Sequence, residues 1–452
     1  MKQMSFDFKS RRSMVVARRG MVAASNPLAS QAGLNILRQG GNAADAAIAA
    51  AAVMNVTAPA STGIGGDCFA LYYEAKTGEV SALNGSGRAP ADLTIDYLKS
   101  QGITEGIPRT SPHAITVPGA AMGWYDLVDR FGRMSLIEVL ADAIHYAEEG
   151  FAVSPVFGHS WASPGPSGYL RRGTNTEEYL PNGNPPQVGQ VVSLKGLART
   201  FRMVAEGGAE AFYNGPIADS IVKTLQSLGG VMTHDDLKAH RSTWDAPISS
   251  DYHGIEVIEQ PPNGQGITAL IAMNIAKAFD LASMDWDDPQ RLHLMIEAMR
   301  LAFADAREYI ADPAKADVPI TALLDEDYAA ERRKLIDPNR AQHPSFGIPP
   351  GGSNTIYLCV VDGEGNACSF INSLYMGGSF GTSIVAKDYG FLFQNRGLGF
   401  SLNPEHRNAL QPGKRPYHTI IPGMALKDGQ LWSAFGVMGG DMQPQGHFQV
   451  MS

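Results

Sequence analysis

Thr355 has the clearest potential for chemistry in this sequence. It follows the flexible break Pro350-Gly-Gly-Ser-Asn354 and opens the strand-like run Thr355-Ile-Tyr-Leu-Cys-Val-Val-Asp362. Its hydroxyl could attack the carbonyl carbon of Asn354, and an acyl shift followed by hydrolysis would separate residues 1–354 from residues 355–452. The new amine, with a reference pKa of about 7.7 to 8, could then accept the hydroxyl proton. The alternative interpretation of this position alone is a β-branched residue that starts a strand.

Other kinds of catalytic site have weaker support. His293 and Glu297 lie one helical turn apart, but there is no HExxH, paired CxxC or calcium loop, so we expect no metal. The glycine runs at 63–66, 377–378 and 439–440 form neither a Walker loop nor a complete dinucleotide fingerprint. We therefore expect close backbone approach at these glycines and no cofactor. A Ser-His-Asp triad stays open because its members come from distant positions, although no GxSxG elbow is present.

Composition narrows the class of partner. The net charge is -9 and the pI is about 5.7, which disfavours a nucleic acid or an anionic membrane surface and favours a small molecule. Three irregularly spaced cysteines predict neither a disulfide framework nor a zinc site, and they fit a reducing compartment. The apolar stretch 14–17 is stopped by Arg18 and Arg19 before it reaches signal-peptide length, so we expect a cytoplasmic protein. The alanine-rich segment 43–60 carries Asp45 and Asn55 and predicts a buried helix rather than a membrane span.

The pattern of apolar residues predicts helices through most of the chain before Asp337. One helix follows the cap Asn26-Pro27, an alanine-rich helix comes directly after it, and others are predicted at 120–131, 136–149, 194–206, 217–228, 267–279 and 291–310. A hairpin is predicted from 69–73 and 80–83. After the Pro/Gly-rich segment 348–352, strands are predicted at 355–361, 367–374, 391–394, 418–426 and 432–437. This arrangement favours two packed sheets with outer helix layers.

Across nearly its whole length the sequence resembles the gamma-glutamyltranspeptidase family of N-terminal-nucleophile hydrolases. The resemblance begins at Gln39-Gly-Gly-Asn-Ala-Ala-Asp-Ala-Ala47 and Gly63-Ile-Gly-Gly66 and continues through Ala147-Glu-Glu-Gly-Phe151 and Gly229-Gly-Val-Met-Thr-His-Asp-Asp-Leu237. It includes Val360-Val-Asp-Gly-Glu-Gly-Asn366, Phe380-Gly-Thr382 and Gly439-Gly440. It implies an α/β (α+β) fold, a four-layer αββα sandwich. It also implies one composite domain that self-cleavage divides into a large subunit, 1–354, and a small subunit, 355–452.

The resemblance implies roles for individual residues. Thr355 would be the nucleophile, released by cleavage after Asn354, and Ser373 would be a second hydroxyl that steadies it. Gly439 and Gly440 would supply the backbone N–H groups of an oxyanion hole; an ordinary turn is the alternative.

Further residues match positions around the acyl donor. Tyr375 takes the place of an asparagine, with a buried core tyrosine as its alternative. Arg88 lies near the family's carboxylate-binding arginine but in a slightly displaced register, so a surface arginine is the alternative. His418 and Thr419 replace a serine pair, and His418 either binds a carboxylate, acts as a titrating group or is structural.

Three departures from the family pattern concern the substrate and the extent of the chain. Gly399 stands where glutamate-specific members keep an acid for the substrate ammonium group, and Arg396, just before it, is a candidate substrate-binding residue. The connection 400–414 is shorter than in members with a lid, which favours hydrolysis over transfer. Family members also continue beyond the position of Ser452, so we expect either a truncated small subunit or a sandwich that is closed differently.

The leading hypothesis is therefore a self-processing amidohydrolase that cleaves gamma-glutamyl amides such as glutathione and whose two subunits form a heterodimer. The second is a related acid-amide hydrolase or acylase, of the oxamate or cephalosporin type. A hypothesis of another class is an uncleaved, inactive binding protein on the same scaffold.

Overall fold

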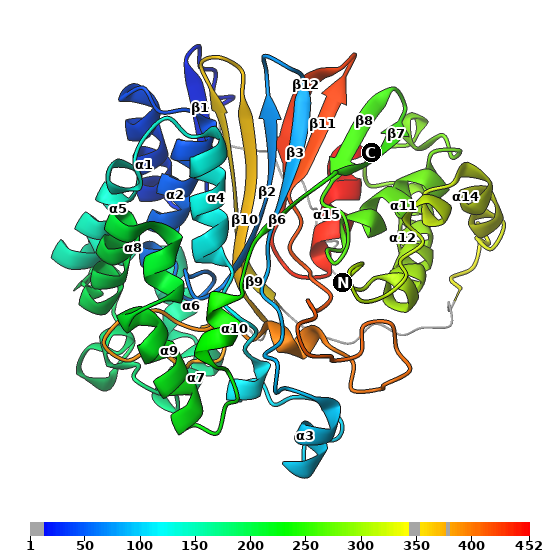
Figure 1. Ribbon diagram of the computed structural model, residues 1–452. Coiled ribbons are helices and arrows are strands. Elements are labelled where there is room, and N and C mark those ends of the chain that lie inside the picture. Colours follow the sequence, from blue (N-terminus) through cyan, green and yellow to red (C-terminus); the bar gives the residue numbers. More distant parts are fainter. Residues whose placement is uncertain (1–12, 343–352, 377–379) are drawn as a thin grey trace, which may run out of the picture.

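The computed structural model describes residues 13–342, 353–376 and 380–452. The predicted break at 348–352 and the pair Gly377-Gly378 lie outside these residues. The described chain forms two antiparallel sheets in the centre, with a layer of helices on each outer side (Figure 1). The predicted four-layer αββα sandwich is confirmed.

The larger sheet has the strand order β1-β9-β10-β2-β3-β6, and each neighbouring pair is antiparallel. Its strands are β1 (Gly20–Ala24), β2 (Asp67–Glu74), β3 (Glu79–Gly85), β6 (Thr243–Asp245), β9 (Ser353–Asp362) and β10 (Ala367–Met376). The two predicted hairpins, β2–β3 and β9–β10, are confirmed. They lie side by side, so the strand that begins at the predicted cleavage point runs through the interior of this sheet.

The smaller sheet has the order β12-β11-β8-β7. Its strands are β7 (Ile248–Tyr252), β8 (Ile255–Glu259), β11 (Gly423–Lys427) and β12 (Gln430–Phe435). Leu71, Tyr73 and Ala82 of the larger sheet pack with Ile258 and Met424 of the smaller one to form a core between the sheets. Each sheet therefore buries one face against the other.

The helix layers bury the outer faces of the sheets. On the side of the larger sheet, α2 contacts β9 and β10, and α4 contacts β2 and β3; on the other side, α11 contacts β7 and β8 (Figure 1). The first layer includes α1 (Pro27–Arg38), α2 (Ala43–Thr57), α4 (Ala120–Phe131), α5 (Leu136–Glu149), α8 (Lys195–Tyr213) and α9 (Pro216–Ser227). The second includes α11 (Gly266–Ala276), α12 (Pro289–Tyr309), α14 (Glu326–Arg333) and α15 (Met442–Met451).

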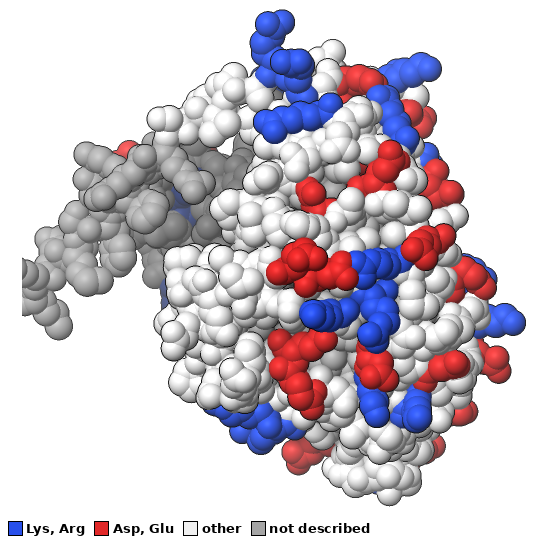
Figure 2. Space-filling view, turned by 90° about the vertical axis from the view of Figure 1, so that its left-hand side faces the viewer, with Lys and Arg blue, Asp and Glu red and all other residues white. Residues whose placement is uncertain are grey.

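Shorter elements lie between the main helices and strands along the chain. They are α3 (Ile95–Ser100), α6 (Pro155–Ala162), α7 (Pro164–Arg171), α10 (His234–Lys238), α13 (Ile320–Leu323) and the two-stranded pair β4 (Phe151–Ala152) and β5 (Val191–Val192). On the face that carries α5 and α8, acidic and basic side chains are interspersed (Figure 2), and Arg202 pairs there with Glu148. Among the helices of the described residues, none combines the length and apolar character needed to cross a membrane.

Local sequence explains the helix starts. The Asn26 side chain accepts the N–H of Leu28 at 2.9 Å, and Asn42 and Asp45 form a reciprocal capping box at the start of α2. Every residue of α2 is buried, as expected for the alanine-rich segment, because small side chains let neighbouring elements approach closely.

Two predicted strands differ from the structure. Residues 391–394 form no strand, and the segment is held by single hydrogen bonds such as Gln394 N–H to the Gly65 carbonyl at 3.1 Å. The strand predicted at 418–426 begins only at Gly423, because Pro422 has no N–H to donate to a ladder. The strands β1, β6, β7 and β8, all before Asp337, were not predicted.

Candidate active site

The centre of the site lies on two neighbouring strands. Thr355 of β9 faces Ser373 of β10 in the antiparallel register, so their side chains lie on the same face of the sheet. The two hydroxyl oxygens are 3.1 Å apart, and the exposed fractions of the residues are 2% and 0%. The two hydroxyls that the sequence predicts to act together therefore lie within hydrogen-bond distance of one another.

A β-bulge lies opposite the peptide bond that joins Asn354 to Thr355. The register shifts between Ser373 and Tyr375, so that Tyr375 faces Asn354 and Leu374 is the additional residue. Tyr375 has a φ of 76°, in the left-handed region that a bulky residue rarely adopts. Ser373 Oγ accepts the Tyr375 N–H at 2.8 Å. A bulge of this kind redirects side chains, and here it brings Tyr375 into the site.

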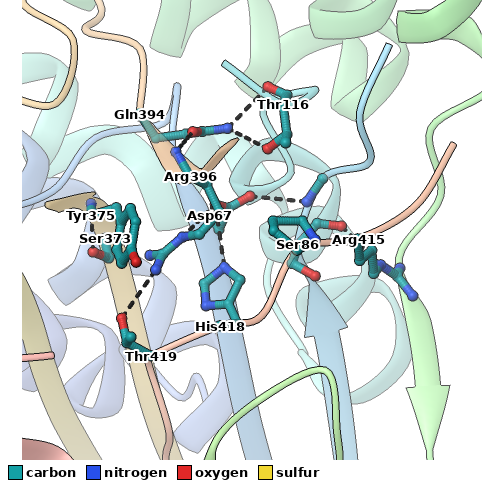
Figure 3. Close-up of polar contacts among 12 residues, drawn as sticks. Asp67, Ser86, Thr116, Ser373, Tyr375, Gln394, Arg396, Arg415, His418 and Thr419 are labelled. Carbon is teal, nitrogen blue, oxygen red and sulfur yellow. Dashed lines mark hydrogen bonds and ion pairs between the residues drawn. The ribbon is translucent and has the colours of Figure 1, made fainter. Parts of the chain in front are cut away.

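Arg396 is fully buried and stacks on Tyr375. Its guanidinium carbon lies 3.8 Å from the centre of the Tyr375 ring, and Nη1 donates to Thr419 Oγ1 at 3.1 Å (Figure 3). Nε is 3.4 Å from Asp67 Oδ2. Burial lowers the pKa of Arg396 to about 10, while Asp67 opposes that shift, so the side chain stays charged at neutral pH. Within the described residues, Nη2 has no hydrogen-bond partner.

Asp67 and His418 form the other side of this cluster. His418 Nε2 lies 3.3 Å from Asp67 Oδ2, and the Gly87 N–H donates to Asp67 Oδ1 at 3.0 Å (Figure 3). Burial raises the pKa of Asp67, but His418, Arg396 and the Gly87 N–H together lower it below its usual value. Burial and the charge of Arg396 lower the pKa of His418 to about 3. The cluster therefore holds a carboxylate and a guanidinium beside a neutral imidazole.

The predicted oxyanion pair lies in the loop before α15. Gly439 and Gly440 have φ values of 124° and 60°, which glycine adopts without steric cost. In the described part of the chain, neither N–H donates a hydrogen bond. Gln265 Nε2 donates to the carbonyls of both Gly440 and Thr419, which joins this loop to the arginine cluster. No contact within the described residues joins either glycine N–H to Thr355.

Arg88 lies apart from this cluster. It is half-buried, and Nη1 donates to the carbonyl of Arg241 at 3.1 Å rather than reaching Thr355 or Tyr375. Ser86, two positions earlier, lies beside Asp67 (Figure 3). The buried arginine that the structure brings to the site is Arg396.

Sequence reasoning missed Asp67 and Gln265. Asp67 follows Gly63-Ile-Gly-Gly66 directly and opens an apolar strand, and that position was a usable signal. Nothing local distinguishes Gln265 from a surface glutamine. The expected close approach is confirmed for the run 63–66, since a Cβ on Gly66 would lie 2.3 Å from the Ser373 carbonyl oxygen.

The residues considered for a metal make other contacts. His293 Nε2 lies 2.8 Å from the Asp337 carbonyl oxygen, and Glu297 pairs with Arg300 at 2.9 Å. Among the residues that the structure describes, no group of three or more His, Cys, Asp or Glu side chains is placed to hold a metal ion.

Comparison with known proteins identifies the family. The Gamma-glutamyltranspeptidase family model matches residues 29–452. The chain is 40% identical over 438 residues to the glutathione hydrolase-like YwrD proenzyme of Bacillus subtilis, covering 95% of this chain and 81% of that protein. It is 37% identical over 437 residues to the oxamate amidohydrolase proenzyme of Klebsiella pneumoniae, covering 95% and 80%.

Solved structures support the same family assignment. A cephalosporin acylase from Bacillus halodurans superposes with a TM-score of 0.91 at 44% identity, covering 99% of this chain and 82% of that one. The gamma-glutamyltranspeptidase of Helicobacter pylori superposes with a TM-score of 0.69 at 29% identity, covering 75% and 97%. The chain is thus an amidohydrolase with the N-terminal-nucleophile fold, and it belongs to the gamma-glutamyltranspeptidase family.

Proposed function

We propose that this protein cleaves itself between Asn354 and Thr355 and then hydrolyses amides through an acyl-threonine intermediate. The observation that carries the proposal is the buried Thr355 hydroxyl, 3.1 Å from Ser373 Oγ and opposite a β-bulge. Two similar proteins are named as proenzymes, which supports processing of this chain as well.

Self-cleavage proceeds in two steps. Thr355 Oγ attacks the Asn354 carbonyl carbon and loses its proton, the C–N bond breaks, and the nitrogen takes up a proton to become a free amine. Water then hydrolyses the resulting ester, which yields a carboxylate on Asn354 and restores the Thr355 hydroxyl. The products are a large subunit, 1–354, and a small subunit, 355–452.

The mature site repeats this chemistry on a substrate. The Thr355 amine accepts the proton of its own hydroxyl as Oγ attacks the substrate amide carbon, and the same proton passes to the departing amine. The N–H groups of Gly439 and Gly440 stabilise the oxyanion, while Ser373 orients Oγ. Water finally cleaves the acyl ester. The short connection 400–414 favours water over an amine acceptor in this last step.

The acyl group that we propose carries a carboxylate. Arg396 Nη2 is a buried, charged donor without a partner in the described residues, and a guanidinium matches a carboxylate in shape and charge. Tyr375 fixes the plane of the guanidinium, and Thr419 fixes one of its edges. Gamma-glutamyl amides such as glutathione meet this requirement through their α-carboxylate.

One observation favours a second candidate, an acid amide without an α-amino group. A Cβ on Gly399 would lie 2.7 Å from the Tyr417 carbonyl oxygen, so this position has no room for an acidic side chain that would pair with an ammonium group. Asp67 already pairs with Arg396. The names of the oxamate amidohydrolase and the cephalosporin acylase support this candidate.

Denaturing electrophoresis tests self-cleavage. The unmodified protein is expected to give two bands that match residues 1–354 and 355–452, whereas Thr355→Ala stays at full length. Thr355→Ser keeps a hydroxyl and is expected to cleave. A single full-length band from the unmodified protein would favour the inactive binding protein instead.

Three anilides that differ only in their acyl group test the substrate class. Glutaryl and γ-glutamyl anilides differ by the α-amino group, and butyryl anilide has no carboxylate. Arg396→Met is expected to lower kcat/KM for both carboxylate donors about 10- to 100-fold, as lost hydrogen bonds to a charged group imply, with little change for butyryl anilide.

The matched control is Arg88→Gln, which removes a half-buried arginine outside the cluster. If Arg88→Gln has the larger effect on the carboxylate donors, the assignment to Arg396 is wrong. Equal or faster cleavage of the glutaryl anilide by the unmodified enzyme supports the acid-amide candidate. Strong preference for the γ-glutamyl anilide supports glutathione-type substrates.

A further inference from the structure

Gln265 is a buried side chain whose polar atoms all make hydrogen bonds within the site. It is the N-cap residue of α11 and has no solvent exposure. Its Oε1 accepts the Tyr417 hydroxyl at 2.8 Å. Since the amide oxygen of Gln265 points towards the Tyr417 hydroxyl, the amide nitrogen Nε2 points away from it.

On that side Nε2 donates to two carbonyls of distant segments. The Thr419 carbonyl oxygen is 2.7 Å away and the Gly440 carbonyl oxygen is 2.9 Å away. The Gln265 backbone N–H also donates to the His418 carbonyl at 2.9 Å. The residue therefore contacts the segment 417–419 with its backbone and with both ends of its side-chain amide.

Each of these segments carries one part of the proposed site. Thr419 Oγ1 accepts from Arg396, which holds the guanidinium of the carboxylate site. Gly440 belongs to the pair proposed to bind the oxyanion. Glycines have no side chain to hold them, and the pair is otherwise anchored through the Gly439 and Gly440 carbonyls, which accept the N–H groups of Met442 and Gln443.

We infer that Gln265 is a positioning residue that holds the oxyanion glycines and the carboxylate site in a fixed position relative to one another. This inference rests on the proposed function. Oxyanion stabilisation depends on donors that are already in place when charge develops, and a displacement of about 1 Å can cost about 100-fold in rate. Because the Gln265 amide donates to the carbonyls of both Thr419 and Gly440, it holds these two segments at a fixed distance from one another.

Two substitutions and one control test the inference. Gln265→Leu removes all three side-chain hydrogen bonds, and Gln265→Glu keeps the size but places a carboxylate against two carbonyls. Asn274→Leu is the control, because Asn274 is a buried amide on the same helix whose Nδ2 donates to Ser250 Oγ and the Leu324 carbonyl, away from the site. Unfolding in urea measures the free energy of unfolding of all three variants, so that their losses of stability can be compared.

Activity separates positioning from stability. Gln265→Leu is expected to lower kcat about 10- to 100-fold for butyryl and glutaryl anilides alike, less than the full loss of an oxyanion donor. It is also expected to raise KM for the glutaryl donor, since the Arg396 partner Thr419 loses its anchor. For Gln265→Glu, the activity relative to the unmodified enzyme is expected to rise as the pH falls, because a protonated Glu can donate to one carbonyl.

The inference is overturned if folded, cleaved Gln265→Leu keeps kcat within twofold of the unmodified enzyme, or if Asn274→Leu loses as much activity. A Gln265 variant that folds but stays uncleaved, while Asn274→Leu cleaves, supports it, since self-cleavage also passes through an oxyanion. If the proposed function itself is wrong, the result differs from these, because the unmodified chain would then stay at full length.

Discussion

The chemistry of this site depends on the Asp67 carboxylate, which Arg396 and His418 share. Asp67 lies 3.4 Å from Arg396 Nε and 3.3 Å from His418 Nε2, and all three side chains are fully buried. A guanidinium without a counter-ion in such a place would be costly, because its desolvation is not offset. Asp67 therefore makes it possible to keep a charged arginine stacked on Tyr375.

Asp67→Asn is expected to destabilise the protein strongly. It leaves the Arg396 charge buried without its partner, and breaking a buried pair in this way costs about 3 to 5 kcal/mol. The free energy of unfolding in urea measures the loss. Glu364→Gln breaks the exposed pair with Arg133 and serves as the control, for which no measurable change is expected. Equal effects of the two substitutions would show that the Asp67 pair is not important for stability.

The buried histidines make stability sensitive to acid. The His240 ring stacks on Tyr213 at 5.2 Å, and neither ring nitrogen has a hydrogen-bond partner within the described residues. Burial, with the nearby charge of Arg415, lowers its pKa to about 3. The unfolded chain, with a pKa of about 6.5, binds the proton more readily than the folded one, so acid favours unfolding.

Stability is therefore expected to fall as the pH decreases from about 6.5 towards 3, by up to about 1.4 kcal/mol per pH unit for each such histidine. His240→Phe removes one of these contributions and should flatten the dependence measured by urea unfolding between pH 7 and pH 4.5. His145→Phe, on the exposed side of α5, should leave the slope as it is. An unchanged slope in His240→Phe would contradict the assignment.

At the scale of elements, the β9–β10 hairpin positions Thr355, the proposed nucleophile, and the segment after α2 supports the hairpin. Gly66 lies so close to β10 that a Cβ would meet the Ser373 carbonyl oxygen at 2.3 Å. Since that carbonyl belongs to the backbone of the strand, a larger residue would have to displace Ser373 and the bulge. The Gly63-Ile-Gly-Gly66 run thus acts through close packing against the catalytic hairpin.

Gly66→Ala is expected to slow self-cleavage about 10- to 100-fold, because a small shift of Ser373 misplaces its contact with Thr355. The fraction of cleaved chain on denaturing gels, followed over time after purification, measures this rate. Gly106→Ala is the control, since a Cβ there meets nothing within 4 Å. Cleavage of Gly66→Ala at the rate of the control would show that β10 tolerates the shift.

At the scale of the whole molecule, the proposed cleavage point would divide the chain but leave both sheets intact. The larger sheet combines β1, β2, β3 and β6 with β9 and β10, and the smaller sheet combines β7 and β8 with β11 and β12. Both sheets thus contain strands from either side of Thr355. We therefore expect the two subunits to stay together after cleavage as a heterodimer, as size-exclusion chromatography under native conditions would show.

The sequence by itself determined many of the local elements and singled out Thr355 as the proposed nucleophile. Caps and glycines place α4 and α5 at the predicted residues, and the two hairpins follow from alternating strands around short turns. It did not predict β7 and β8, two short, partly polar strands that pair with each other, because β8 is also stabilised by pairing with β11, far along the chain. Thr355 could be recognised because its neighbours in the sequence carry the family pattern.

Only the tertiary structure decided which charged and polar groups join Tyr375 in one buried cluster. Arg396, Asp67, His418 and Gln265 come from separate segments, and their meeting depends on the packing of two sheets and on a bulge that turns Tyr375 inward. It also placed Arg88 outside this cluster and Arg396 within it. The physical reason is that a nucleophile is defined by its local chemistry, whereas a binding pocket is defined by long-range contacts that no local pattern encodes.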